Sequence, residues 1–199
     1  MDNNVMFKIS YGLYVLTARK GEKRNGCIIN TLSQVTTSPN QVSITVNKDN
    51  FTHDLIAETK EFNASILSEK VTFGTFKHFG FQSGRDTDKF ADYPAETSGN
   101  GLPYITEGAN GFLSAKVTGQ LDLGTHTLFI ADVTDGKVFA ETPSVTYDYY
   151  HKNIKEAPAK PAKKGWVCKI CGYVYEGDPL PPDFICPICK HGAADFEKL

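Results

Sequence analysis

Residues 166–189 read WVCKICGYVYEGDPLPPDFICPIC and contain four of the five cysteines of the chain. Cys168 and Cys171 form one Cys-x2-Cys pair, fourteen residues follow, and Cys186 and Cys189 form a second pair. Two such pairs supply four soft thiolates in a tetrahedral array, the geometry that selects iron or zinc. About 35 residues, the length of this C-terminal part, cannot bury a core large enough to fold alone. The spacing therefore predicts a metal site.

The cysteine spacing alone leaves the identity of the metal open. A zinc ribbon is the general interpretation of this spacing, and a disulfide pair is the alternative that needs no metal. The N-terminus, Met1-Asp2-Asn3-Asn4, lacks the basic start and apolar centre of a signal peptide. We therefore expect a cytoplasmic protein, and in the reducing cytosol cysteines bind metal more often than they form disulfides.

The residues around the cysteines resemble rubredoxin. The matching residues are a glycine after the first pair and four aromatic residues: Trp166, Gly172, Tyr173, Phe184 and Phe196. The resemblance implies one iron held by the four thiolates, with Gly172 in a tight turn whose N–H groups point at sulfur. Hydrogen bonds and dry aromatic packing of this kind tune an iron–thiolate potential. The segment Glu176–Ile185 is shorter than in free-standing rubredoxins and is more similar to the modules fused to other redox domains.

The charge distribution divides the chain into three parts. Residues 1–151 carry a net charge of −4, residues 152–164 a net charge of +4, and residues 165–199 a net charge of −2. The middle part is rich in Lys, Pro and Ala, which is typical of a solvated linker, and its prolines favour extended polyproline geometry. At about 3.1 Å per residue the linker would reach roughly 40 Å. We predict that this segment is a mobile tether; the alternative is a linker that only joins two domains.

Residues 1–151 show mostly the pattern of β-strands. Gln41–Asn47 alternates polar and apolar side chains with a period of two, as a half-buried strand does. Further strands are predicted at residues 11–17, 26–31, 62–67, 111–121 and 126–133, with a hairpin connection at 20–26. One helix is predicted to begin near Thr52 and another to span 71–79. The pattern predicts a mainly β fold, an antiparallel β-barrel with a few helices.

Five short motifs in residues 1–151 resemble the flavin-reductase-like FMN-binding split barrel. They are Asn30-Thr31-Leu-Ser33-Gln34-Val-Thr36, Asn47-Lys48-Asp-Asn50-Phe-Thr52, Phe81-Gln-Ser83-Gly84-Arg85-Asp-Thr-Asp-Lys89-Phe90, Asn100-Gly101-Leu-Pro103 and His126-Thr-Leu-Phe-Ile-Ala-Asp-Val133. The resemblance implies a split antiparallel (Greek-key) barrel that is a homodimer, with FMN near the subunit interface. The chain has no Gly-x-Gly-x-x-Gly turn of a Rossmann unit, so a nicotinamide would bind only transiently over the flavin.

The motifs supply candidate FMN-binding residues and leave the catalytic residues open. A helix that begins at Thr52 would offer free N–H groups and a positive dipole end to the phosphate, and Lys48 and Lys89 would add charge. The full set is Asn30, Thr31, Ser33, Gln34, Thr36, Asn47, Lys48, Asn50, Thr52, Ser83, Gly84, Arg85 and Lys89. The alternatives are a helix cap at Thr52, an exposed polar strand face for the first motif, and turn residues for the others.

Several other side chains invite a simpler interpretation. Cys27 lies in an apolar strand and is predicted to be a small buried hydrophobe. His126 is predicted to be structural, with a place near the flavin as the alternative. His53 is a possible neighbour of the phosphate, and the tyrosines of residues 147–150 are predicted to pack the end of the barrel rather than cover a flavin.

The two resemblances together imply an electron-transfer oxidoreductase similar to the large, flavin-containing rubredoxins of anaerobes. NADH or NADPH would supply electrons to FMN, and the iron would pass them to a protein acceptor, in that group usually a flavo-diiron protein that reduces oxygen or nitric oxide. One alternative is a flavin reductase that releases reduced FMN to a separate oxygenase. Another is a non-enzymatic zinc-ribbon binding protein. With a net charge of −2 and no apolar run of about 18 residues, neither a nucleic-acid nor a membrane partner is expected.

Overall fold

The structure, a computed structural model, describes residues 5, 8–156 and 165–199. The chain forms two compact units, Met1–Ile154 and Lys155–Leu199. A π-helix, η2 (Tyr150–Ile154), ends the first unit, so the first residues of the predicted linker are helical. Residues 157–164, on which most of the predicted extended linker falls, lie outside the described residues.

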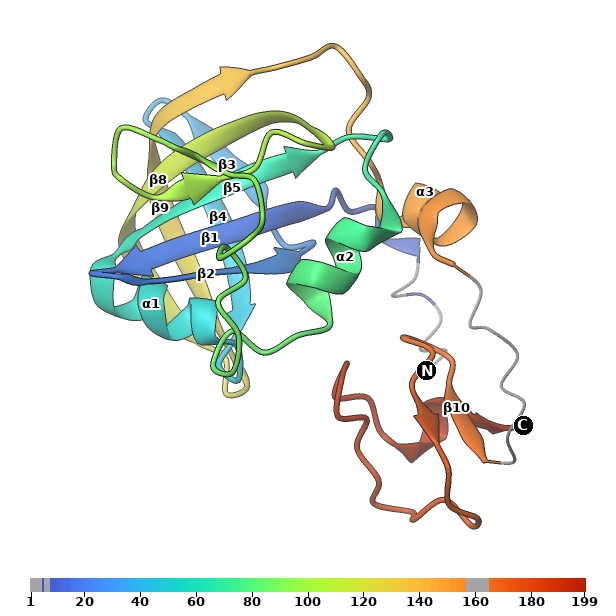
Figure 1. The fold of residues 1–199 in the computed structure, drawn as a ribbon. Coiled ribbons are helices and arrows are strands. Elements are labelled where there is room, and N and C mark those ends of the chain that lie inside the picture. The colour runs from blue at the N-terminus through green and yellow to red at the C-terminus, as the bar shows by residue number, and fades with distance from the viewer. Residues whose placement is uncertain (1–4, 6–7, 157–164) are drawn as a thin grey trace. The chain divides into compact units, whose positions relative to one another are not determined.

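The first unit is built on one antiparallel sheet of seven strands, in the order β2-β1-β5-β8-β9-β4-β3 (Figure 1). The strands are β1 (Tyr14–Lys20), β2 (Lys23–Ile29), β3 (Ser33–Thr37), β4 (Asn40–Asn47), β5 (Glu61–Leu67), β8 (Ala109–Asp122) and β9 (His126–Val138). A short ribbon of β6 (Glu96–Thr97) and β7 (Pro103–Tyr104) interrupts the loop before β8. The predicted mainly β, antiparallel fold is confirmed.

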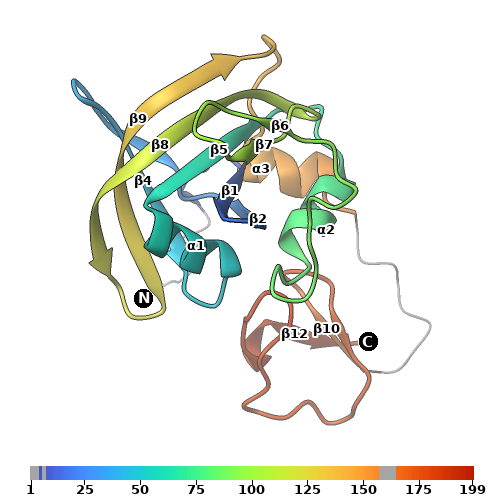
Figure 2. The same cartoon turned by 60° about the vertical axis from the view of Figure 1, so that its left-hand side comes forward.

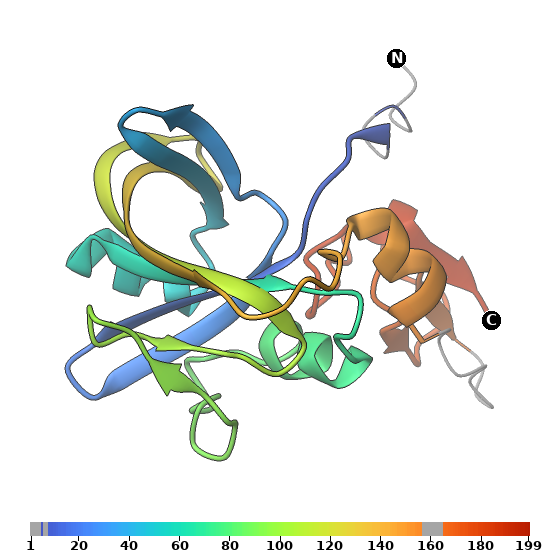
Figure 3. The same cartoon turned by 90° about the horizontal axis from the view of Figure 1, so that it is seen from above.

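The sheet is strongly curved (Figure 3), and side chains from both of its ends pack into one core. Leu16 of β1 and Cys27 of β2 pack in the same buried cluster as Ile44 of β4, although these strands lie far apart in the strand order. Among the described residues no ladder joins β2 to the β3–β4 hairpin. A side chain crosses this split instead: Thr31 Oγ1 donates to the Thr45 carbonyl (2.7 Å) and accepts from the Thr45 N–H (3.1 Å). The barrel is therefore split at this seam.

The first hairpin differs from its predicted bounds. Strands were expected at 11–17 and 26–31, but β1 extends to Lys20 and β2 begins at Lys23, so that only Gly21 and Glu22 connect them. The residues nearest the turn of this hairpin are polar. Because apolar alternation stops before them, the sequence pattern predicts both strands too short at this end. The strand β3 was not among the predicted strands because all five of its residues are exposed and only one is apolar.

Both predicted helices of the barrel are present. The helix α1 (Phe51–Thr59) begins at the N-cap Asn50 and ends at Lys60, whose backbone is left-handed (φ 62°). Its buried residues Leu55 and Ile56 pack against the barrel core, and Figure 2 shows the helix at the end of the curved sheet. The helix α2 (Phe73–Gly80) buries Phe76 and Phe79 in a second cluster.

The segment before the linker packs on this second cluster. A short helix, α3 (Tyr147–Tyr149), leads into η2, and Tyr150 is 8% exposed with its ring 4.4 Å from that of Phe76. Tyr147 meets Tyr11 edge-on. The prediction that these tyrosines pack the end of the barrel is confirmed.

The second unit is a small sheet with an aromatic and sulfur core. Its strands are β10 (Trp166–Cys168), β11 (Val174–Tyr175) and β12 (Phe196–Lys198), in the order β11-β10-β12, with a 3-10 turn, η3 (Ala193–Asp195), before β12. The Phe184 ring lies 4.7 Å from Tyr175 and 5.3 Å, edge-on, from Phe196. Within the described parts of both units, every helix is too short or too polar to cross a bilayer.

Candidate metal centre and flavin site

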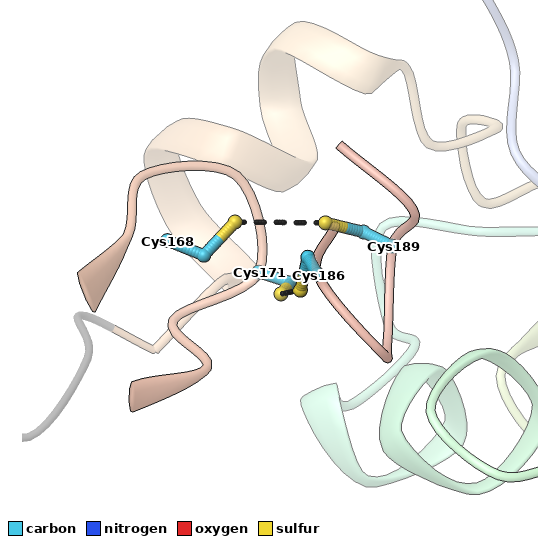
Figure 4. Close-up of side chains that lie close together, drawn as sticks. All are labelled: Cys168, Cys171, Cys186 and Cys189. Atoms are coloured by element: carbon cyan, nitrogen blue, oxygen red, sulfur yellow. Dashed lines mark hydrogen bonds between the residues drawn. The ribbon is translucent and has the colours of Figure 1, made fainter. Parts of the chain in front are cut away.

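The four cysteines of the second unit converge (Figure 4). Their sulfur atoms all lie within 4.8 Å of one another, with 3.5 Å between Cys168 and Cys189 and 3.4 Å between Cys171 and Cys186. These distances are far longer than a disulfide bond of about 2.05 Å. A tetrahedral metal with metal–sulfur bonds of about 2.3 Å would place its sulfurs about 3.8 Å apart. The donor set and its spacing therefore fit a single four-thiolate metal ion.

Two similar backbone turns carry the ligands. Gly172 N–H donates to the carbonyl of Cys168 (2.8 Å), and Lys190 N–H donates to the carbonyl of Cys186 (3.0 Å). Gly172 and Lys190 both have left-handed backbone, with φ of 80° and 61°. Each turn thus closes on its first cysteine and leaves the following amides free to face sulfur.

Backbone amides donate to three of the sulfurs. Tyr173 N–H donates to Cys171 Sγ and His191 N–H to Cys189 Sγ, while two amides reach Cys186 Sγ. Burial raises the pKa of the Cys171 thiol to about 11, so a thiolate there needs a compensating cation. The amides supply part of that compensation and a bound metal ion would supply the rest, in agreement with the predicted tight turn at Gly172.

In the barrel, the N-terminus of α1 gathers several of the predicted flavin-binding residues. Asn50 Oδ1 accepts from Thr52 N–H (3.0 Å), so this helix amide is capped by a side chain. Thr52 is fully buried; its hydroxyl accepts from Asn25 Nδ2 (3.0 Å) and hydrogen-bonds the Cys27 thiol. Burial raises the pKa of that thiol, and Cys27 is 2% exposed, which confirms the prediction of a buried side chain.

A pocket of about 460 Å³ opens beside this helix end. Phe51 lines it together with Gly84 and Arg85 of the loop 83–88 and the tip of the β1–β2 hairpin. Arg85 Nη2 donates to Asp54 Oδ2 (2.7 Å), and its guanidinium lies 5.5 Å from the centre of the Phe51 ring. Burial acts to raise the pKa of Asp54, but hydrogen bonds from Arg85 and His53 outweigh it and hold that pKa low.

Two features mark the contact between the loop 83–88 and β2 beside this pocket. A β-carbon on Gly84 would lie 2.1 Å from Asn25 Oδ1, so that only glycine allows the loop backbone to approach so closely. Asn25 is fully buried, and its Oδ1 has no hydrogen-bond partner among the described residues. This oxygen accepts hydrogen bonds only, so it offers a place to a donor and not to a phosphate oxygen. The pocket is lined by both basic and acidic side chains, including Arg24, Arg85 and Asp88.

The first motif lies away from this pocket. Ser33, Gln34 and Thr36 are exposed on β3, where Gln34 Nε2 donates to Asn40 Oδ1 (3.0 Å) and Thr36 donates to the Pro39 carbonyl. Asn30 immediately precedes Thr31, whose hydroxyl is engaged at the barrel seam. Ser33, Gln34 and Thr36 thus form a polar strip along β3, and Asn30 and Thr31 lie in the connection from β2 to this strand.

The second motif divides between the turn before α1 and the first residues of that helix. Asn47 Oδ1 accepts from Asp49 N–H (2.9 Å) and shapes the turn before α1, as its turn interpretation expects. Lys48 pairs with Asp122 (2.6 Å) on the β8–β9 hairpin. The structure thus brings Asn50, Thr52, Gly84 and Arg85 together at the helix end, with Ser83 Oγ accepting from Arg85 N–H (3.2 Å) in the adjoining turn.

Lys89 occupies a different environment from the one expected of a phosphate ligand. It is 2% exposed, and its ammonium donates to the carbonyls of Gly26 (2.9 Å) and Phe79 (2.8 Å). Burial lowers its pKa. The side chain is held by backbone groups of β2 and α2.

The histidines have partners within the fold. His53 Nε2 pairs with Thr127 Oγ1 (2.9 Å), and His126 Nδ1 with Thr125 Oγ1 (2.9 Å). His78 Nε2 pairs with the Lys89 carbonyl (2.6 Å). Sequence reasoning missed Phe51, which lines the pocket, and Asn25, which packs against Gly84 of the loop beside it. Asn25 fell inside the expected hairpin connection, and Phe51 stands unremarked between two polar motif residues, so neither carried a signal of its own.

Comparison with known proteins agrees with both parts of this description. Residues 6–158 match the family described as flavin reductase like domain, and residues 166–197 match the rubrerythrin, rubredoxin-like domain. The chain belongs to the flavin reductase-like family and carries a rubredoxin-like domain. Its two domains make it a protein of flavin-linked electron transfer. The two family matches and the four converging cysteines confirm the predicted cofactors, FMN for the barrel and one iron for the small domain.

Individual relatives share one or both domains of this flavin reductase-like protein. It is 36% identical, over the full length of both chains, to the high molecular weight rubredoxin of Moorella thermoacetica. It is 35% identical to the ferric-chelate reductase (NAD(P)H) of Archaeoglobus fulgidus, over 76% of this chain and 89% of that one. The solved structure of flavin reductase PheA2 is similar to the barrel, with a TM-score of 0.62 and 28% identity over 73% of this chain and 93% of PheA2.

Proposed function

We propose that the protein takes electrons from NADH or NADPH at the flavin domain and passes them through the rubredoxin-like iron site to a protein acceptor. The observation that carries the proposal is the presence of both domains in one chain, since a four-thiolate iron site needs an electron source. When bound, FMN supplies the step between a two-electron hydride donor and a one-electron iron acceptor. The full-length similarity to a high molecular weight rubredoxin supports this arrangement.

The residues of the chain have separate tasks in this proposal. In the barrel, Gly84 and Arg85 with the capped start of α1 bind the phosphate end of FMN, and the polar strip of Ser33, Gln34 and Thr36 faces the ring and ribityl chain. The phosphate-binding and ring-binding parts of the site are supported by the remaining predicted residues: Asn30, Thr31, Asn47, Lys48, Asn50, Thr52 and Ser83. Every residue of β3 is exposed, so this strand leaves the proposed place of the flavin ring open to solvent. This opening supports the proposed homodimer with FMN near the subunit interface.

The iron site supplies the exit for electrons. Cys168 and Cys186 are fully buried, whereas Cys171 and Cys189 are partly exposed, so one edge of the sulfur cluster faces solvent. A protein acceptor would dock on this edge. The resemblance to the large rubredoxins favours a flavo-diiron oxygen or nitric oxide reductase as the acceptor, and the thiol chemistry favours the cytoplasm.

The experiment that tests the proposal follows both cofactors in one stopped-flow mixture. NADH or NADPH is added to the oxidised holoprotein under anaerobic conditions, and flavin and ferric-thiolate absorbance are recorded together. We expect the flavin to bleach first and the iron bands to follow. Cys186→Ala should retain flavin reduction and lose electron delivery to an added flavo-diiron protein. The control Lys169→Ala, an exposed residue beside a ligand, should retain both. Delivery at the wild-type rate by Cys186→Ala would refute the relay.

The likeness to flavin reductase PheA2 favours a second candidate function, a reductase that releases reduced flavin. Gel filtration of the flavin-loaded protein separates the two. Flavin that stays with the protein supports the relay, and flavin that elutes separately supports release to another enzyme.

A further inference from the structure

Lys89 is a buried ammonium that links two separate elements of the barrel. One hydrogen bond reaches the Gly26 carbonyl in β2 (2.9 Å) and another reaches the Phe79 carbonyl near the end of α2 (2.8 Å). A charged group is retained in such a place only when its donors are satisfied. Two of the three ammonium N–H groups are therefore committed to the backbone.

The backbone on either side of Lys89 is held as well. His78 Nε2 donates to the Lys89 carbonyl (2.6 Å), and Phe90 N–H donates to Asp88 Oδ1 (2.9 Å). Arg24 Nη2 donates to the Phe90 carbonyl (2.8 Å), and Arg24 Nε lies 3.6 Å from Asp88 Oδ1. Residues 88–90 are thus fixed from α2 on one side and from β2 on the other.

The loop that ends at this anchor is the one that lines the pocket. Gly84 packs its backbone against the Asn25 amide, and Arg85 bonds Asp54 of α1. Gly84 and Arg85 themselves lie in a turn, which is closed by a hydrogen bond from Asp86 N–H to the Ser83 carbonyl (3.2 Å). The loop 83–88 is therefore tethered at both ends, and Lys89 is the tether at its C-terminal end.

We propose that Lys89 is a positioning residue, which holds the loop 83–88 in the conformation that presents Gly84 and Arg85 to the flavin phosphate without contacting the phosphate itself. The assignment rests on the proposed FMN site and replaces the direct charge role that the sequence suggested. Moving the ammonium to a ligand would leave two buried carbonyls without a donor, and the loss of both hydrogen bonds opposes such a move.

Amide hydrogen exchange of the flavin-free full-length protein tests the anchor without any ligand. Lys89→Met keeps the length of the side chain and removes its donors, and we expect exchange of the loop 83–88 to accelerate about tenfold relative to the wild type. His78→Phe keeps the ring stacked on Tyr93 and removes the bond to the Lys89 carbonyl, so it provides a milder second variant that should accelerate the same amides. Lys116→Met, an exposed lysine on β8, is the matched control. Unchanged loop exchange in both Lys89→Met and His78→Phe would overturn the proposal.

A double-mutant cycle on FMN affinity, measured by flavin fluorescence, tests whether Lys89 affects FMN binding through the loop 83–88. If Lys89 acts through the loop, Arg85→Ala should weaken FMN binding in the wild type but change it by less than about twofold in the Lys89→Met background. Effects that multiply independently would show a separate contact of Lys89 with the ligand and would contradict the proposal. Should the wild type bind no FMN, the proposed function fails, and the exchange experiment still decides the anchor.

Discussion

Gly172 and Lys190 occupy equivalent positions in the two turns of the metal centre, and both have left-handed backbone (φ 80° and 61°). Glycine adopts this conformation without strain, whereas a residue with a β-carbon pays roughly 1–2 kcal/mol. The first turn therefore carries the residue that suits it, and the second turn is strained by its lysine.

Gly172→Ala should lower the stability of the iron-loaded small domain by about 1–2 kcal/mol, because the new β-carbon clashes in left-handed backbone. Lys190→Gly should change it in the opposite direction. Guanidinium titration followed by ferric-thiolate absorbance measures both. The matched control is Gly192→Ala, since Gly192 has φ −79° and open space around its missing β-carbon. Equal effects of Gly172→Ala and Gly192→Ala would contradict this account.

Tyr104 gives the barrel a pH-dependent contribution to stability. Its hydroxyl donates to Glu96 Oε2 (2.6 Å), and this bond, with burial, raises the pKa of Tyr104 from 10.0 to about 12. The unfolded chain loses this proton first, so the free energy of unfolding should fall as the pH rises from about 10 to about 12. Tyr104→Phe keeps the ring stacked on Phe112 and should flatten that decline. Urea unfolding at a series of alkaline pH values measures it; parallel curves for variant and wild type would exclude the effect.

At the scale of elements, α1 joins the barrel core to the pocket. Its apolar side buries Leu55 and Ile56, while its N-terminus meets β2 through Thr52 and Asn25 and the loop 83–88 through Asp54 and Arg85. The same helix end that the sequence predicted as a phosphate site is thus also a structural junction. Its position and its cap decide whether the pocket keeps its shape.

Asn50→Ala should destabilise the barrel by about 1 kcal/mol, because it removes the side-chain acceptor for Thr52 N–H. Asn50→Asp keeps an acceptor at the cap and should retain the stability, yet it adds a negative charge where the FMN phosphate is proposed to bind. We therefore expect a lower melting temperature for Asn50→Ala than for Asn50→Asp in thermal unfolding. Flavin titration should show weaker FMN binding in Asn50→Asp. Wild-type affinity in that variant would place the phosphate elsewhere.

For the whole molecule, the two units differ in what stabilises them. The barrel has two large apolar clusters, whereas the buried core of the small unit consists of Cys168, Cys186 and Phe196 with partly buried neighbours. We therefore expect the small unit, and not the barrel, to depend on its metal ion for folding.

Removal of iron should unfold the small unit and leave the barrel intact. Thiolate ligands take up protons as the pH falls, so iron affinity should decrease with acidification, and a chelator at mildly acid pH should release the metal. Hydrogen exchange resolved by segment should then show loss of protection in 165–199 alone, with recovery after iron is restored. A single loss of protection across both units would show that the barrel too needs the metal.

The sequence by itself determined the fold class, the metal ligands and the family. Strand alternation and cysteine spacing are local signals, and each reports a geometry set within a few residues. Only the tertiary structure decided the hydrogen-bond partners of Asn25, Thr31 and Lys89. Their partners lie 27, 14 and 63 residues away along the chain, for Thr52, Thr45 and Gly26 respectively. No local pattern records such contacts, because a buried polar group takes whichever partner the packing of distant elements brings within reach.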